Sequence, residues 1–297
     1  MSITIFLKNL LLLALLVAVS PYVINALKGY RLPTTDMGSK VAIVSIKGQL
    51  ADSTCYAEQL HHYFKADDIK AILLKIDSPG GAQGTGEALF GEIDLLKREH
   101  KKPVIVFVEN LCTSAAYLIA SAADYIVSSP SALVGGIGTT LPWLFHVNDF
   151  LKEHNIGYTP IKAGEYKMAG CAFTAMTLEE QGHLQAIVDD AYDQFVRMVA
   201  MQRHLSPDTR DAWANGRLFT GVRAKQAGLI DAVGSLQKVA RVIKEKALID
   251  GEIEWVKESC ATIWQRLFGD PSGRWGVSHS LSTLLHSCLE HSHATLG

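Results

Sequence analysis

The sequence predicts an α/β fold built around a parallel sheet. Near-continuous apolar runs at 41–46, 71–76 and 103–108 have the length and composition of strands that are buried on both faces. A segment with helical spacing of its apolar residues, 87–99, lies between two of these runs. Strands that alternate with helices are joined by right-handed crossovers, so we expect neighbouring strands to run parallel.

An uncharged apolar stretch comes first in chain order. It covers 19 residues, 9–27, and has a lysine at each end. A helix needs about 20 apolar residues to cross a bilayer, and Ser20-Pro21 is a poor cleavage site for a secretory signal. We therefore expect a transmembrane anchor rather than a removed signal peptide. The charges on its two sides do not decide its orientation.

The same patterns predict the later elements, which are a helix at 114–123, a strand at 125–127, a long helix at 178–203 and a last helix at 235–247. Gly228 suits the left-handed position after a helix.

From about residue 250 the composition changes, with three of the five tryptophans and four of the eleven histidines in this tail.

Composition and charge exclude several function classes. The net charge is −2 without a long basic run, so the chain lacks the cationic face that nucleic acid binding requires. The five cysteines form no CxxC pair, which argues against a zinc site. The histidines of the tail lack an accompanying carboxylate pattern. We therefore expect no metal and no cofactor.

A glycine-rich turn, Ser78-Pro79-Gly80-Gly81, ends the second predicted strand. Glycine permits a sharp turn and lets a substrate carbonyl approach exposed backbone N–H groups. That is the geometry of an oxyanion hole, which stabilises the negative charge of an acyl-transfer intermediate. By itself the motif is weak, because many loops contain Pro-Gly-Gly, and a plain tight turn is then the favoured interpretation.

The segment Cys112-Thr113-Ser114-Ala115-Ala116-Tyr117 passes from a strand into a helix. A nucleophile placed there would benefit from the partial positive charge of the helix N-terminus. The simpler interpretation of Ser114 is an N-cap residue, a common role for serine. Cys112 is a rival nucleophile, but it comes two residues earlier, before the helix.

Lys167 lies in the segment Ile161–Gly170. Burial lowers the pKa of a lysine, and a neutral lysine can then act as general base for a serine hydroxyl. The alternative is a solvated surface lysine. A conventional histidine base would require a different fold, and its candidates are His100, His146, His154 and His183.

Together these segments resemble the signal peptide peptidase A (protease IV) family of serine proteases, in its single-domain bacterial form. The resemblance covers 41–245, and the segments follow the family's order. It implies that Ser114 is the nucleophile, Lys167 the general base, and Gly81 and Ala115 the donors of the oxyanion hole. The matching segments are 76–81, 114–117, 122–124, 135–138, 162–167, 220–221 and 227–231.

The same resemblance implies a Clp-protease/crotonase-like superhelix of ββα units, with an N-terminal transmembrane helix. It also implies a homo-oligomeric ring in the inner (cytoplasmic) membrane, with a single-pass anchor and the protease domain outside the cytoplasm. The expected substrates are remnants of cleaved signal peptides or other apolar peptides. The predicted parts are an anchor at 1–31, a linker at 32–40, a serine protease domain at 41–248 and a C-terminal extension at 249–297.

The chain departs from the family pattern at two places. Ala115-Ala116 stands where the family usually has a glycine pair after the nucleophile. Gly136 stands where the family usually has a serine that hydrogen-bonds the lysine base. We expect Thr139, Thr140 or a water molecule to supply the missing hydroxyl.

Three alternatives remain open at this point. A protease of phage capsid maturation shares much of the pattern at 114–231, although such an enzyme has no use for the apolar segment 9–27. A catalytically weak scaffold for membrane proteins would have no need to retain Ser114 and Lys167. A crotonase-type acyl-CoA enzyme shares the architecture but needs no serine–lysine pair.

Overall fold

The computed structural model describes residue 20 and residues 39–141 and 144–257. The chain divides into two compact units, 1–258 and 259–297, and the described residues belong to the first. Apart from Ser20, the predicted anchor segment 9–27 lies outside the described residues, as does most of the predicted C-terminal extension. Among the described helices, none combines the length and the apolar composition needed to cross a membrane.

Three long parallel strands form the centre of the sheet. They are β1 (Ser39–Leu50), β2 (Ile69–Gly81) and β3 (Val104–Thr113). Each contains one of the apolar runs found in the sequence, and the predicted parallel pairing is confirmed. Each strand also continues past its apolar run, so β2 includes the glycine-rich turn and β3 ends directly before Ser114.

Five shorter strands complete the sheet, which has the order β6-β5-β3-β2-β1-β8, with β4 pairing β3 and β7. β5 and β6 are antiparallel, an exception to the predicted pattern. β8 pairs with β1, so the sheet continues beyond residue 248. The five strands are β4 (Tyr125–Ser128), β5 (Leu133–Gly135), β6 (Leu218–Thr220), β7 (Ala232–Val233) and β8 (Ile253–Lys257).

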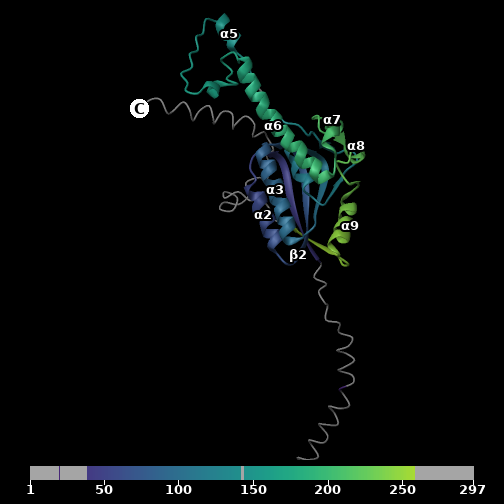
Figure 1. Cartoon of the computed structure of the whole chain (residues 1–297). Helices are drawn as coiled ribbons and strands as arrows, with labels where there is room; N and C mark the ends of the chain where they lie inside the picture. Colours follow the sequence, from purple (N-terminus) through teal and green to yellow (C-terminus); the bar gives the residue numbers. More distant parts are fainter. Residues whose placement is uncertain (1–19, 21–38, 142–143, 258–297) are drawn as a thin grey trace, which may run out of the picture. The chain divides into compact units, whose positions relative to one another are not determined.

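Helices cover both faces of this sheet, as Figure 1 shows. On one face α2 (Thr54–Lys65), α3 (Gln83–His100) and α4 (Ala115–Ser121) pack on alternate strand residues such as Val44, Leu74 and Val106. On the other face α9 (Leu236–Ala247) packs on the intervening residues, among them Leu73 and Ile105. This alternation explains why the strands are apolar throughout, since both faces are buried.

Two helices near the site begin at residues other than the predicted ones. α3 begins at Gln83, four residues before the predicted start and directly after the turn at Gly81. α4 begins at Ala115, so Ser114 lies between strand and helix. The smaller helical elements are α5 (Asn148–Glu153), η1 (Glu165–Met168), η2 (Pro207–Thr209), α7 (Arg210–Trp213) and α8 (Gly221–Gln226).

The long helix α6 (Leu178–Arg203) has the predicted bounds, and Thr177 and Glu180 form a capping box at its start. Only its second half enters the core, beginning at Phe195. Residues 144–177, called the arm below, contain α5 and η1 and precede this helix. No residue between 144 and 194 is buried. The arm and the first half of α6 therefore stand clear of the core (Figure 1).

Candidate active site

Ser114 occupies the turn between β3 and α4 in an unusual backbone conformation, with φ 55° and ψ −131°. A positive φ is uncommon outside glycine, and such strain clusters at functional sites. The conformation is held by its surroundings: the Ser114 N–H donates to the Gly135 carbonyl at 2.8 Å, and the N–H of Tyr117 donates to the Ser114 carbonyl at 2.9 Å. Its side chain forms no capping hydrogen bond, so the simple N-cap interpretation is wrong.

The glycine-rich turn of β2 packs directly against this serine. A Cβ atom on Gly80 would lie 2.8 Å from the Ser114 Cβ and 2.7 Å from the Thr113 carbonyl oxygen. A Cβ atom on Gly81 would lie 2.1 Å from the Leu50 carbonyl oxygen. All three distances are too short for any side chain. Gly80 therefore allows the backbone of β2 to approach Ser114, and Gly81 allows it to approach Leu50 of β1.

Ser114, Gly81 and Ala115 line one cavity of about 440 Å³. Three of the four predicted site residues are thus brought together. Ala115 is the first residue of α4, so its N–H has no acceptor within that helix. The remaining lining residues are Gln49, Ala82, Gln83, Gly138, Thr139, Thr140, Leu141 and Phe195.

Lys167, the fourth predicted residue, lies on the arm in η1. Its side chain is exposed, and it does not line the cavity of Ser114. Within the part of the chain that the structure describes, Lys167 therefore lacks the burial that would favour a neutral amine. The structure places the serine and the lysine on two separate parts of the fold.

The hydroxyl groups expected near the base are present in the cavity. Gly136 lies beside Ser114 with φ 59°, and a Cβ atom there would be 3.5 Å from the Ser114 nitrogen. Thr139 and Thr140 both line the cavity. The Thr139 hydroxyl donates to Gln83 Oε1 at 2.9 Å, whereas the Thr140 hydroxyl donates to the neighbouring Leu141 carbonyl. Sequence reasoning missed Gln83, although its place immediately after the glycine turn was a usable signal.

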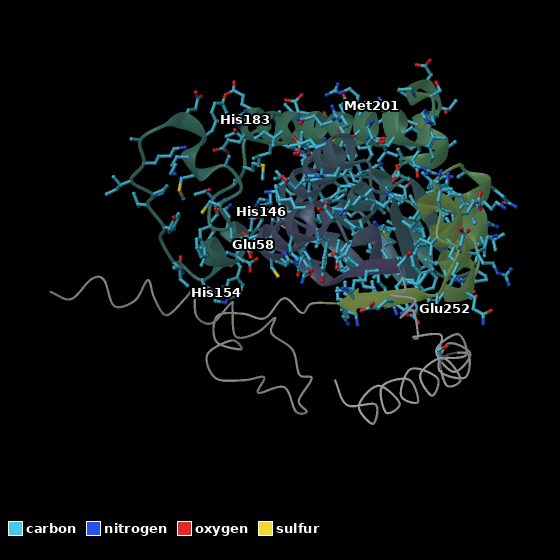
Figure 2. The ribbon with its side chains drawn as sticks, turned by 90° about the horizontal axis from the view of Figure 1, so that it is seen from below. Glu58, His146, His154, His183, Met201 and Glu252 are labelled. Carbon is cyan, nitrogen blue, oxygen red and sulfur yellow. The ribbon has the colours of Figure 1, made fainter. Side chains whose placement is uncertain are left out.

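The rival catalytic groups do not lie at this cavity. Cys112 is fully buried, and burial raises the pKa of its thiol well above the ordinary value. None of the candidate histidines lines the cavity. His146, His154 and His183 lie on the arm and near the start of α6 (Figure 2), and His100 ends α3. Within the described ranges no group of three His, Cys, Asp or Glu side chains could hold a metal ion.

The segment 227–231, which the sequence comparison also singled out, holds α4 in place through hydrogen bonds and an ion pair. The Tyr117 hydroxyl is buried and donates to the Leu229 carbonyl at 2.7 Å. Asp231 forms an ion pair with Arg203 at 3.0 Å and also accepts the Ile126 N–H. These contacts tie α4 to α6 and β4, so the segment holds the serine turn in place without itself reaching the cavity.

A second cavity of about 930 Å³ adjoins the first and shares Thr139, Thr140 and Leu141 with it. The arm and the first half of α6 supply its other walls, which include the apolar side chains of Leu184 and Val188.

Comparison with known proteins finds one matching family and several similar sequences. The model of peptidase family S49 matches residues 96–250, which are 155 of the 297 residues. The chain is 38% identical over 199 residues to the protein MJ0651 of Methanocaldococcus jannaschii, with 67% of this chain and 63% of that protein covered. It is 33% identical over 220 residues to the chloroplastic serine protease SPPA of Arabidopsis thaliana, with 70% of this chain and 31% of that protein covered.

The chain thus spans less than two thirds of the length of either relative. A solved structure of a membrane-bound stomatin-specific protease aligns with a TM-score of 0.48 and 16% identity, covering 75% of this chain and 99% of that one. The matched residues 96–250 include both Ser114 and Lys167. The chain belongs to peptidase family S49, the signal peptide peptidase A family.

Proposed function

We propose that the chain is a membrane-anchored endopeptidase in which Ser114 is the nucleophile and Lys167 the general base. The observation that carries this proposal is the strained turn at Ser114, which shares one cavity with Gly81 and Ala115. Strain of this kind persists only when the surrounding structure enforces it. The serine hydroxyl is thereby held at the cavity rather than turned to cap a helix.

The reaction is acyl transfer. The neutral amine of Lys167 takes the proton of the Ser114 hydroxyl, and Oγ forms a bond with the scissile carbonyl carbon. The N–H groups of Gly81 and Ala115 hold the oxyanion. The lysine ammonium then gives its proton to the leaving amine as the peptide C–N bond breaks. Water hydrolyses the acyl-enzyme with the same lysine as base, and Ser114 regains its proton.

Lys167 reaches Ser114 in an assembly of several copies. The lysine is exposed on an arm without a buried residue, and Ser114 lies in the cavity of the sheet domain. The arm also exposes large apolar side chains, with Phe145 69% and Phe150 58% exposed. Apolar surface of this kind typically marks a protein interface. A homo-oligomeric ring would cover the arm and bury the lysine beside the serine of a neighbouring copy.

The substrates are apolar peptides, among them remnants of cleaved signal peptides. The cavity of Ser114 is walled largely by small or apolar side chains, including Ala82, Leu141 and Phe195. It therefore suits small or apolar residues at the cleavage site. The apolar segment 9–27 anchors the chain in the inner (cytoplasmic) membrane, where such peptides are released, with the protease domain outside the cytoplasm.

The test is cleavage of an apolar peptide by the full chain in detergent, compared with Ser114→Ala and Lys167→Ala. We expect both variants to lose about 1,000-fold or more in kcat/KM, as when a nucleophile or its base is removed. Lys162→Ala is the matched control: it lies on the same arm, and its ammonium donates only to the Glu165 carbonyl. Equal behaviour of all four proteins would instead favour a scaffold without catalysis.

A further inference from the structure

We propose that Gln83 is a positioning residue, and that the Thr139 hydroxyl it holds is the acceptor that orients the amine of the general base. This inference rests on the proposed function. It concerns the cavity of Ser114, which both residues line. It assigns to this pair the hydrogen bond that a side chain at Gly136 would otherwise supply.

The side-chain amide of Gln83 is fixed in one orientation. Its Nε2 lies 2.8 Å from Glu87 Oε1 and 2.8 Å from the Ala191 carbonyl oxygen. Both partners are acceptors, so the amide nitrogen must occupy this side. The opposite atom, Oε1, then faces Thr139. This one side chain therefore joins three parts of the fold: helix α3, helix α6, and the loop with Thr139 that follows β5.

The orientation of Gln83 also fixes the direction of the Thr139 hydroxyl. The two oxygens are 2.9 Å apart, and Oε1 of the amide can only accept. The hydroxyl must therefore donate its single proton to Gln83. Its remaining lone pairs are available only to a donor, so Thr139 offers the cavity an acceptor and nothing else.

An acceptor is what a lysine base needs at this place. A neutral amine carries two N–H groups and one lone pair, and the lone pair must face the Ser114 hydroxyl to take its proton. An acceptor for one N–H holds the amine in that orientation, whereas a donor would compete for the lone pair. No side chain that lines this cavity is an acid or a base. Of the two threonines in the cavity, Thr139 is half-buried and held by a side chain that is itself fixed, whereas Thr140 is exposed and donates to the carbonyl of the next residue. Thr139 is therefore the hydroxyl assigned to this role.

Ionisable groups near the pair are few. Glu87 lies on the far side of Gln83, where it accepts from Nε2. His146, Asp149 and Lys152 line the adjoining cavity that shares Thr139. These groups are the ones that could move a pH profile independently of the base, and they are left unchanged in the experiment.

The experiment measures kcat, KM and the pH profile of kcat/KM for Thr139→Val and Gln83→Met in the full chain. We expect Thr139→Val to lower kcat about 10-fold or more with little change in KM. The acid limb of the profile should move to lower pH, because the lost acceptor stabilised the protonated amine. Gln83→Met should act in the same direction but less strongly, and Thr139→Ser should restore most of the activity.

Thr85→Val is the control. Its hydroxyl is two residues from Gln83 and donates to the Ala51 carbonyl, outside the cavity. A higher KM with an unmoved acid limb in Thr139→Val would show that Thr139 binds a substrate amide, and it would overturn the inference. Wild-type kinetics in both cavity variants would do the same. Full activity of Ser114→Ala would instead contradict the proposed function itself. That result differs from the two above, which contradict only the role assigned to Thr139.

Discussion

Ser114 keeps its positive φ because two neighbouring segments pack against it and hydrogen-bond to it. Gly80 approaches its Cβ, Gly136 lies beside its nitrogen, and the Gly135 carbonyl accepts its N–H. A strained residue of this kind costs about 1–3 kcal/mol of folding free energy. The buried packing of α4 on the sheet offsets this cost. The geometry of the proposed nucleophile is therefore a property of its surroundings more than of the serine.

The two free cysteines of the described residues differ in a way that alkylation can measure. The backbone N–H of Phe173 lowers the pKa of the Cys171 thiol, whereas burial raises the pKa of Cys112. A lowered pKa means that thiolate is present at lower pH. We expect iodoacetamide to modify Cys171, with a pH midpoint below that of free cysteine, and to spare Cys112 in the folded protein. Peptide mapping by mass spectrometry reads both sites, and early modification of Cys112 would contradict its burial.

At the level of elements, the close approach of α3 to α4 sets the position of Ala115. A Cβ atom on Gly86 of α3 would lie 2.9 Å from the Ala115 Cβ and 3.1 Å from its carbonyl oxygen. The same helix contains Gly91, which is exposed, and a Cβ atom there would meet nothing within 4 Å. One glycine therefore permits helix packing at the site, and the other does not contribute to packing.

These two glycines give a matched pair of variants. Gly86→Ala should destabilise the fold by about 1–3 kcal/mol through overpacking and lower kcat, because it displaces Ala115. Gly91→Ala should stabilise it by about 0.5–1 kcal/mol through helix propensity and leave kcat unchanged. Urea unfolding and peptide cleavage measure the two effects. A neutral result for Gly86→Ala would mean that α3 shifts without consequence for the site.

The sequence was informative wherever a pattern was local. The strands of the central sheet are apolar on both faces, so their apolar runs could be recognised in the sequence. The long helix α6 has the predicted bounds. α2 was missed because only Leu60, Tyr63 and Phe64 on its last turns are deeply buried apolar residues, within an otherwise polar segment. Gln83 was missed because its partners Thr139 and Ala191 are 56 and 108 residues away. The exposure of Lys167 depends on the path of the whole arm, which no local pattern records.

On the scale of the whole molecule, α6 divides into two functional halves. Its second half packs against the core from Phe195 onward, and its first half carries the arm with Lys167. The proposed base is thus joined through the arm to one end of α6, and the other end of α6 packs on the core that contains the Ser114 turn. This separation leads to a prediction about mixed assemblies.

Co-expression of Ser114→Ala and Lys167→Ala chains with different tags should restore activity that neither variant has alone. A Lys167→Ala copy retains its serine and can accept the lysine of a Ser114→Ala neighbour. Random mixing in a symmetric ring leaves about a quarter of the sites complete. The peptidase activity of tandem-purified mixed assemblies measures this. Two differently tagged Ser114→Ala chains are the control, and a mixture as inactive as that control would mean that each dyad forms within one chain.

The absence of buried residues between 144 and 194 has a consequence for control of the activity. In the proposed assembly the base comes from a neighbouring copy, so a single newly made copy would be inactive. The rate per chain would then depend on concentration, falling on dilution and rising where copies gather. The proposed membrane anchor would confine the copies to two dimensions and raise their local density. Control of this proposed activity would then depend on the density of copies in the membrane and would not require the removal of an inhibitory segment.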